Sequence, residues 1–345
     1  MQIIKPDVKI NFVGRRKIAY GLSIIMLLAS MVSLIAQGGP KYGIDFAGGA
    51  EILVQLDQPV PIETVKAALA DIGLDGSAVQ KYGQGLGDNY RILVAADQSA
   101  STDLATTIKA GLNEGTGATV DEKSFSFEMV GPQVGRDLRE KALLAMFFAL
   151  LFITVYISGR FELKWFISAV MAICLALAVY ALNLIDLSIP ALMLAALIVT
   201  LILFWFLNLK YAMGAIVALI HDVTITVGLF SIFGKEFTLP IIAALLTIIG
   251  YSLNDTIIVF DRIRENLRKH HRDPLMTIIN TSINQTLGRT LLTSLTTLMV
   301  VIILFVLGGG IIHDFAFALI VGVLVGTYSS IFVASPILLA WQKRS

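Results

Sequence analysis

The chain has 345 residues, of which 56% are hydrophobic and only 15% are charged. This is more apolar surface than a single water-soluble core can bury, so the composition predicts a membrane protein. The formal net charge of +1 shows no basic excess of the kind that nucleic-acid binders carry, so no nucleic-acid partner is expected. The single cysteine, Cys174, lies in an apolar stretch, which excludes a disulfide framework or a thiolate metal site built from this chain alone.

The first apolar segment, 18–36, follows a basic arm, 1–17. Its uncharged length suits a retained membrane-spanning helix, and no A-x-A cleavage site follows it. Seven further stretches are long enough to cross the roughly 30 Å hydrocarbon layer: Ala142–Ser158, Trp165–Leu182, Leu187–Leu209, Tyr211–Gly234, Phe237–Asn254, Thr290–Ile312 and Phe315–Gln342. The sequence therefore predicts an α-helical polytopic membrane protein with eight spans, seven of them in a bundle over 142–342.

The connections between the predicted spans differ in charge. Lys and Arg residues gather in the arm 1–17, around Arg160 and Lys210, in the loop 261–289 and in the tail 343–345, whereas the alternate short connections carry one lysine between them. Because positive residues mark cytoplasmic connections, the arm, the loop and the tail are all predicted to be cytoplasmic. Long segments translocate regardless of their charge, so 37–141 is predicted to lie on the outer, periplasmic side.

The segment 37–141 has the patterns of a small water-exposed domain. Apolar residues alternate in strand-like runs or recur at helical spacing, and a helix begins near Pro61 and ends near Gly73. The expected elements, in the order β-α-β-β-α-β, are Glu51–Leu56, Pro61–Gly73, Val79–Tyr82, Asn89–Ala95, Ser101–Asn113 and Lys123–Val130. This order predicts a small α+β ferredoxin-like domain.

The second to fifth predicted spans share a weak internal similarity at an offset of 46 residues, with Leu151 matching Leu197 and Thr154 matching Thr200. One hypothesis is that a helical hairpin has been duplicated. The alternative is a chance match, because apolar helices resemble one another often.

Asp255 is the first candidate for membrane chemistry. It directly follows the last residue of the predicted sixth span, about four residues before a helix end near Val259–Arg262, and shares a helix face with Tyr251 and Thr247. Desolvation favours the neutral form of such a carboxylate and a nearby guanidinium favours the ionised form, so moving one helix can switch it. Asp255 is therefore a candidate proton carrier; the alternative is a carboxylate that only caps or pairs within the bundle.

Arg289 opens the predicted seventh span and is followed at helical spacing by Thr293 and Thr297. Arginine stays charged at any accessible pH, so it is a candidate fixed counter-charge; the alternative is an interfacial arginine that reaches the headgroups. The adjacent His221 and Asp222 form a candidate relay pair. Neighbouring residues point about 100° apart on a helix and need not touch, so a structural hydrogen-bonding role is the alternative.

Three motifs, far apart in the chain, resemble one family. They are Tyr42-Gly-Ile-Asp-Phe-Ala-Gly-Gly49, the stretch around Asn254-Asp255 that ends at Asn266, and Asn284–Ser294. They are similar to the signatures of the SecD/SecF family of the RND-like superfamily, and the order Asn254-Asp255 is that of its SecF branch. Against the usual six-span pattern of that branch, about 163–208 is an inserted transmembrane hairpin.

The resemblance implies an RND-like bundle and an accessory role in the Sec translocase, in which the proton-motive force, used together with SecD, promotes preprotein export. It implies a proton relay of Asp255 and Arg289, with Asn254, Asp222 and His221 as further candidates. It also implies a signature or hinge made of Gly43, Ile44, Asp45, Phe46, Gly48 and Gly49.

The partners that the resemblance implies are SecD, the SecYEG channel, YajC, YidC, the translocating preprotein and the bilayer of the bacterial inner membrane. Protons would be the coupling ion, and neither a cofactor nor a metal is expected. Two alternatives from other classes are a passive scaffold for SecD and the channel, and a proton-coupled exporter of small solutes. An enzyme is not predicted, because the sequence shows no nucleophile constellation, metal-ligand cluster or phosphate loop.

Overall fold

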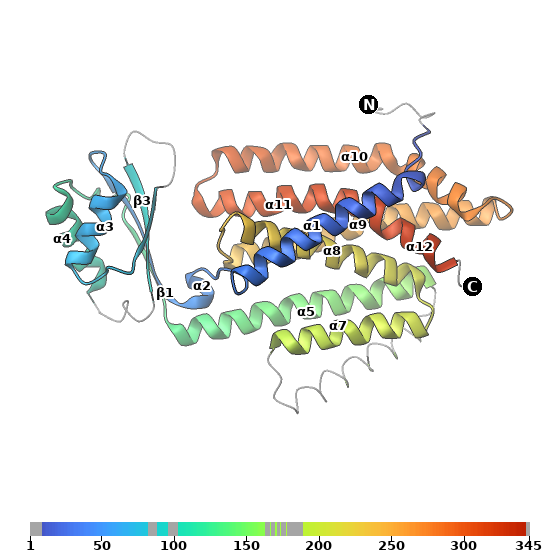
Figure 1. Ribbon diagram of the computed structural model, residues 1–345, viewed down its shortest axis with the longest axis horizontal. Helices are drawn as coiled ribbons and strands as arrows, with labels where there is room; N and C mark the ends of the chain where they lie inside the picture. The colour runs from blue at the N-terminus through green and yellow to red at the C-terminus, as the bar shows by residue number, and fades with distance from the viewer. Residues whose placement is uncertain are drawn as a thin grey trace.

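The computed structural model describes residues 9–81, 88–95, 103–162 and 189–342, together with four single residues between the last two ranges. The chain forms a small α/β domain and a bundle of long helices (Figure 1). The domain lies at one end of the bundle, and both ends of the described chain lie at the opposite end. This arrangement requires an even number of crossings of the bundle.

The small domain is built on a four-stranded sheet with the order β2-β3-β1-β4, in which all neighbours are antiparallel. Ile52 on β1 lies opposite Ile92 on β3, and both pack in one core with Val65 and Leu112 from the two helices. This strand order, with the chain order β-α-β-β-α-β, is the split arrangement of ferredoxin-like domains, so the predicted domain fold is confirmed. Its elements are β1 (Gly49–Leu56), α3 (Ile62–Asp71), β2 (Ala78–Lys81), β3 (Asp88–Val94), α4 (Leu104–Thr116) and β4 (Ser126–Val130).

The bundle consists of helices that are apolar over most of their length. They are α1 (Arg16–Ala36), α5 (Pro132–Glu162), α7 (Ile189–Phe206), α8 (Lys210–Ile232), α9 (Leu239–Lys269), α10 (Leu275–Leu307), α11 (Gly310–Ser329) and α12 (Ser335–Gln342). A π-helical segment, Ser330–Ala334, joins α11 to α12. A short 3₁₀ helix, Val13–Arg15, precedes α1, and the short α2 (Ile44–Ala47) follows it.

Six helical segments in the described ranges are long and apolar enough to cross a membrane: Val13–Ala36, Pro132–Phe161, Lys210–Ile232, Leu239–Lys269, Leu275–Leu307 and Ile312–Trp341. They confirm a polytopic helical membrane protein. A seventh apolar helix, α7, lies against α5 and α8 at the position of the fourth predicted span. The third predicted span, Trp165–Leu182, falls almost wholly outside the described residues, so the count of eight stays a prediction.

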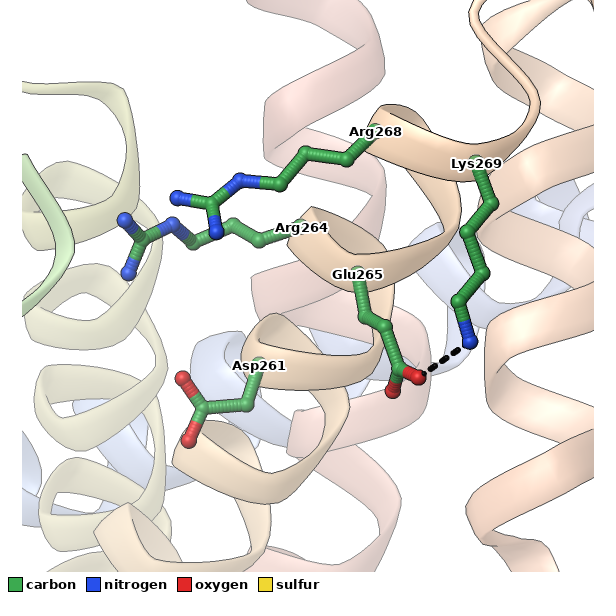
Figure 2. A pocket seen from close by; sticks show the side chains of 5 residues that line it. All are labelled: Asp261, Arg264, Glu265, Arg268 and Lys269. Atoms are coloured by element: carbon green, nitrogen blue, oxygen red, sulfur yellow. Dashed lines mark hydrogen bonds and ion pairs between the residues drawn. The ribbon is translucent and has the colours of Figure 1, made fainter.

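Several helices extend further than the sequence predicts. The segment 261–289, predicted as a cytoplasmic loop, is helical except between Lys269 and Leu275, and α5 begins ten residues before the predicted start at Ala142. Pairs along and between the helices support the polar extension of α9: Glu265 with Lys269 (2.7 Å, Figure 2), Asp261 with Arg160 (2.9 Å), and Asn266 with Ser282 on α10 (2.8 Å). Charged residues mark the end of the apolar layer, but they do not end the helix.

Helices α9 and α11 pack closely through two glycines. A Cβ atom on Gly322 would lie 2.2 Å from Ile248 Cγ1, and one on Gly326 would lie 2.9 Å from the Cβ atom of Ser252. Small residues four positions apart on α11 thus let the two helices approach closely.

Helix α1 lies on the outside of the bundle and is attached along one seam. Ser23 contacts His221, Ser30 lies where a Cβ atom on Gly228 would be, and Ser33 bonds Ser231 at 2.8 Å. All three pairs share an offset of 198 residues, so α1 and α8 run parallel in one continuous register.

The close approach at Gly326 gives a stability prediction. Gly326→Val is expected to force α9 away from α11 and to lower the free energy of unfolding by about 1–3 kcal/mol, the usual cost of overpacking. Gly21→Val is the matched control, because nothing lies within 4 Å of a Cβ atom at Gly21 on α1. Thermal unfolding of the detergent-purified protein measures both, and equal stability of the two variants would contradict this packing.

Candidate functional site in the membrane bundle

Ionisable and hydroxyl side chains are buried inside the bundle. Such groups are costly in a membrane unless they have hydrogen-bond partners or lose their charge. The partners of each group therefore show whether it is held in place. The buried set on α8 to α11 and the π segment includes His221, Asp222, Thr226, Ser252, Asp255, Thr256, Thr286, Thr290, Ser294, Ser329 and Ser330.

Asp222 is fully buried and fully supplied with hydrogen bonds. Ser252 Oγ on α9 donates to Asp222 Oδ2 at 2.5 Å, and Ser329 Oγ on α11 donates to the same oxygen at 2.7 Å. Oδ1 lies 2.9 Å from Nδ1 of His221. The two neighbours on α8 thus do touch, and their carboxylate ties α8, α9 and α11 together.

His221 extends this cluster to α1. Its Nε2 atom lies 3.1 Å from Ser23 Oγ, and Ser23 Oγ lies 3.1 Å from the Tyr328 hydroxyl. Tyr328 in turn donates to the carbonyl oxygen of Ala19 at 2.6 Å. Sequence reasoning identified the His-Asp pair but missed Ser23 and Tyr328, because single hydroxyls in two apolar spans carry no signal of contact across 305 residues.

Asp255 is the opposite case. Its side chain is 1% exposed, and neither carboxylate oxygen has a hydrogen-bond partner in the described part of the chain. It also stands near the middle of α9, not near a helix end as the sequence indicated, because α9 continues to Lys269. A carboxylate in this position is stable in its neutral form or when another group reaches it.

The register between α9 and α10 places a second unpartnered group beside Asp255. Tyr251 donates to Ser294 at 3.3 Å, and Ser294 bonds Thr327 on α11 at 2.7 Å. Since α9 and α10 run antiparallel, Asp255, one turn after Tyr251, is level with Thr290, one turn before Ser294. The hydroxyl of Thr290 is buried and also lacks a partner among the described residues.

The other two predicted members of the relay lie on the outer surface of the bundle. Arg289 is exposed near the middle of α10 and acts electrostatically on Asp255, although no ion pair within 4.0 Å joins them in the described structure. Asn254 is exposed on α9 and makes no side-chain hydrogen bond to the described residues. The charge of Arg289 thus acts on Asp255 from a side chain that, like that of Asn254, faces outward.

The predicted signature, Gly43–Gly49, contacts the first residue of α9, the helix that carries Asp255. The carboxylate of Asp45 accepts a hydrogen bond of 2.8 Å from the backbone N–H of Leu239, the first residue of α9. Gly48 has a φ of 78°, and a Cβ atom there would lie 2.9 Å from Pro132 Cα at the start of α5. The signature therefore joins β1 to the first residues of α5 and α9.

A chain of ion pairs crosses between the domain and the bundle. Glu51 and Arg91 form a bidentate ion pair (2.7 and 2.9 Å) within the domain. Arg91 also lies 3.1 Å from Glu236 in the α8–α9 connection. Glu236 in turn lies 2.9 Å from Lys41. Burial lowers the pKa of Arg91, but the hydrogen bonds and charges of Glu51 and Glu236 outweigh burial and raise it above its ordinary value. Sequence reasoning missed this chain, because its members are separated by up to 195 residues.

No metal site accompanies these groups in the described ranges: nowhere there do three His, Cys, Asp or Glu side chains come together as ligands. Ionisable side chains inside a bundle of spanning helices are typical of membrane proteins that move ions or are driven by them. The fold and the site thus define a polytopic helical membrane protein with ionisable groups buried between its helices.

Comparison with known proteins narrows this class to one family. Residues 112–189 and 178–344 match the family described as protein export membrane protein SecD/SecF, C-terminal, and residues 33–60 match the SecD/SecF GG motif. The chain belongs to the SecD/SecF family, in its SecF branch of protein translocase subunits. The overlap of the two matches, at 178–189, falls inside the predicted inserted hairpin.

Full-length relatives support the SecF assignment. The chain is 41% identical to protein translocase subunit SecF of Magnetococcus marinus, over all of this chain and 96% of the relative. It is 39% identical to the subunit of that name from Vibrio alginolyticus, over 98% of this chain and 91% of the relative.

Two solved structures share the fold. A crystal structure of SecDF, a translocon-associated membrane protein from Thermus thermophilus, matches with a TM-score of 0.71 and 31% identity, covering 99% of this chain and 40% of that one. SecDF in its super-membrane-facing form matches with a TM-score of 0.59 and 31% identity. The chain thus spans about two fifths of the length of the solved SecDF proteins.

The contrast between the two buried carboxylates predicts opposite effects on stability. Asp222→Asn weakens three hydrogen bonds to a charged group, so it is expected to lower the free energy of unfolding by roughly 1.5–3 kcal/mol. Asp255→Asn removes a carboxylate that has no hydrogen bonds to the described residues, so stability should stay the same or rise. Chemical or thermal unfolding of the purified variants measures the difference, and a larger loss for Asp255→Asn would contradict the two environments.

Proposed function

We propose that this chain is a proton-driven subunit of the protein-export machinery of the bacterial inner membrane and that Asp255 is its proton carrier. The observation that carries the proposal is that the Asp255 carboxylate is buried in a spanning helix, has no hydrogen-bond partner among the described residues, and is acted on by the fixed charge of Arg289. The names of the relatives support the export role.

The comparison with Asp222 explains why Asp255 is the carrier. Three donors hold Asp222 in one state, and a group held in this way has little to gain from binding or releasing a proton. Asp255 has no such support, so its neutral form suits the conformation seen here. Its ionised form becomes stable when a small helix movement brings Arg289 or the Thr290 hydroxyl to its oxygens.

A second membrane subunit completes the site. Asn254 on α9 and Arg289 on α10 are exposed in mid-membrane, and Thr247 and Thr296 are exposed beside them on the same two helices. A guanidinium facing lipid at this depth is costly, so a protein surface is the stable neighbour. SecD is the partner we propose for this face. The similarity to SecDF, of which this chain matches only 40%, supports the pairing.

The proposed orientation has both termini and the charged ends of α9 and α10 on the cytoplasmic side. The arrangement supports it, because the chain ends share one end of the bundle and the small domain lies at the other (Figure 1). The domain is then periplasmic, where an exported chain emerges from the SecYEG channel. YajC and YidC remain partners that only the family resemblance suggests.

The coupling route runs along α9. Protonation of Asp255 changes the packing of α9, whose first backbone N–H is bonded to Asp45 of the signature. The ion pairs of Glu236 with Arg91 and Lys41 join the same end of the bundle to the domain. A shift of α9 therefore reaches β1 and β3 directly, which is how the outer domain would be moved.

Export and proton uptake test the carrier. With SecD co-reconstituted, Asp255→Asn is expected to reduce proton uptake into proteoliposomes and preprotein export to the level without the subunit, because Asn cannot exchange a proton. Asp261→Asn on the same helix is the control, since Asp261 is 44% exposed and paired at the surface, where such pairs contribute little.

Copurification of SecD shows that each variant still assembles. If Asp255→Asn still supports export and proton uptake at the wild-type level, the carrier role is wrong and the chain is better explained as a passive scaffold. Proton uptake that persists without SecD and moves small solutes would instead support a self-sufficient exporter.

The link between the domain and the bundle has its own test. Glu236→Gln replaces a 6% exposed charge that faces Arg91 and Lys41, and losing one partner of a buried ion pair costs roughly 3–5 kcal/mol. Hydrogen exchange of residues 41–49 is expected to become faster, and export should fall while proton uptake persists. Glu122→Gln, at an exposed pair with Lys109, should change neither; unchanged exchange in Glu236→Gln would exclude this route.

A further inference from the structure

The hydrogen-bond chain from Asp222 to Ala19 requires a definite number of protons. It contains four contacts in a row: Asp222 to His221 (2.9 Å), His221 to Ser23 (3.1 Å), Ser23 to Tyr328 (3.1 Å) and Tyr328 to the Ala19 carbonyl (2.6 Å). Each contact needs one proton between its two heavy atoms. The hydroxyls of Ser23 and Tyr328 supply one proton each, so the other two must come from the His-Asp pair.

The direction of the chain is fixed from its far end. The Ala19 carbonyl oxygen can only accept a hydrogen bond, so the Tyr328 hydroxyl donates its one proton to it. Ser23 must therefore donate to Tyr328, and the contact between Ser23 and His221 is filled only if Nε2 of His221 carries a proton. The contact between Nδ1 of His221 and Oδ1 of Asp222 requires a second proton. We place it on Nδ1, because imidazole is the more basic group and because the two serine donors at Oδ2 favour an ionised carboxylate.

A neutral imidazole cannot satisfy this geometry. It carries one proton, so with an ionised Asp222 one of the four contacts would lack a donor, and two acceptors would face each other in a buried site. An imidazolium fills all four contacts. It also makes the His-Asp pair neutral overall, which suits a site where His221 is 4% exposed and Asp222 is fully buried.

We propose that His221 is a second proton-binding site of this protein, occupied in this structure, and that its bound proton latches α1 to α8 and α11. The titratable groups that face it are Asp222 on α8 and Tyr328 on α11. Asp255 lies one turn beyond Ser252 on α9, and α1 contributes the hydroxyl of Ser23. When the proton leaves, the contact between His221 and Ser23 or between Ser23 and Tyr328 is lost.

The latch bears on the proposed function, because α1 leads directly into the signature at Gly43. Loss of the proton would loosen the Ser23 end of the seam while Ser30 and Ser33 still pack on α8. Proton binding at His221 is therefore a second means of controlling the segment that joins the domain to the membrane. The proton count itself does not depend on the transport role of Asp255.

The test is a nitrogen NMR titration of the histidines in the detergent-solubilised full chain. The chain has four histidines, and His221→Gln identifies the signals of His221. At neutral pH the wild-type protein should show protons on both Nδ1 and Nε2. In Tyr328→Phe and in Ser23→Ala the count no longer requires the second proton, so the proton affinity of His221 should fall about five- to tenfold, the value of one hydrogen bond.

Ser33→Ala is the matched control, since it removes another hydroxyl of the same seam, bonded to Ser231 and outside the chain, and should leave the titration of His221 unchanged. An unprotonated Nε2 in the wild-type protein would overturn the proposal. So would an unchanged titration in both Tyr328→Phe and Ser23→Ala. Because the readout needs no transport, a failure of the carrier role of Asp255 would leave its result unaffected.

Discussion

A carboxylate inside an apolar bundle is stable if it gives up its charge or if donors surround it. Two buried acidic residues of this bundle, Asp222 and Asp255, differ in this respect. Asp222 is surrounded by two serines and a histidine, whereas Asp255 has no hydrogen-bond partner in the part of the chain that the structure describes. Ser252, one turn before Asp255 on α9, joins the two environments. Helix α9 therefore donates a hydrogen bond to the carboxylate of Asp222 on α8 through Ser252, while its own carboxylate, Asp255, receives none from the described residues.

Helix α9 is bonded to the signature and to several neighbouring helices along its whole length. Its first residue is bonded to the signature through Asp45, its middle contacts α8, α10 and α11 through Ser252 and Tyr251, and its far end is tied to α5 and α10 through Asp261 and Asn266. The glycines of α11 let the two helices touch along this length. A closely packed helix of this kind shifts as a unit, so a change at Asp255 is felt at both ends.

The sequence predicted well whatever depends on local pattern. Period and hydropathy located the six long apolar helices and the β-α-β-β-α-β order. The roles of Asp255, Arg289 and the pair His221-Asp222 stay predictions. The prediction of a loop over 261–289 was wrong, because a run of charged residues has the same pattern in a loop as on a helix that leaves the membrane. Ser23, Tyr328, Glu236 and Arg91 could not be found, because their roles arise from contacts between residues hundreds of positions apart or in separate elements.

The outward position of Arg289 explains why the proposed switch is not complete within one chain. A fixed cation that lies beside Asp255, yet faces away from the bundle core, has its field set by whatever covers that face. Lipid would leave the cation poorly solvated, whereas a subunit with its own polar groups would orient it. The state of Asp255 would then report on the fit of the neighbouring subunit as well as on the local proton concentration. Export driven by such a site depends on assembly, because the subunit that completes the face also sets the charge balance around the carrier.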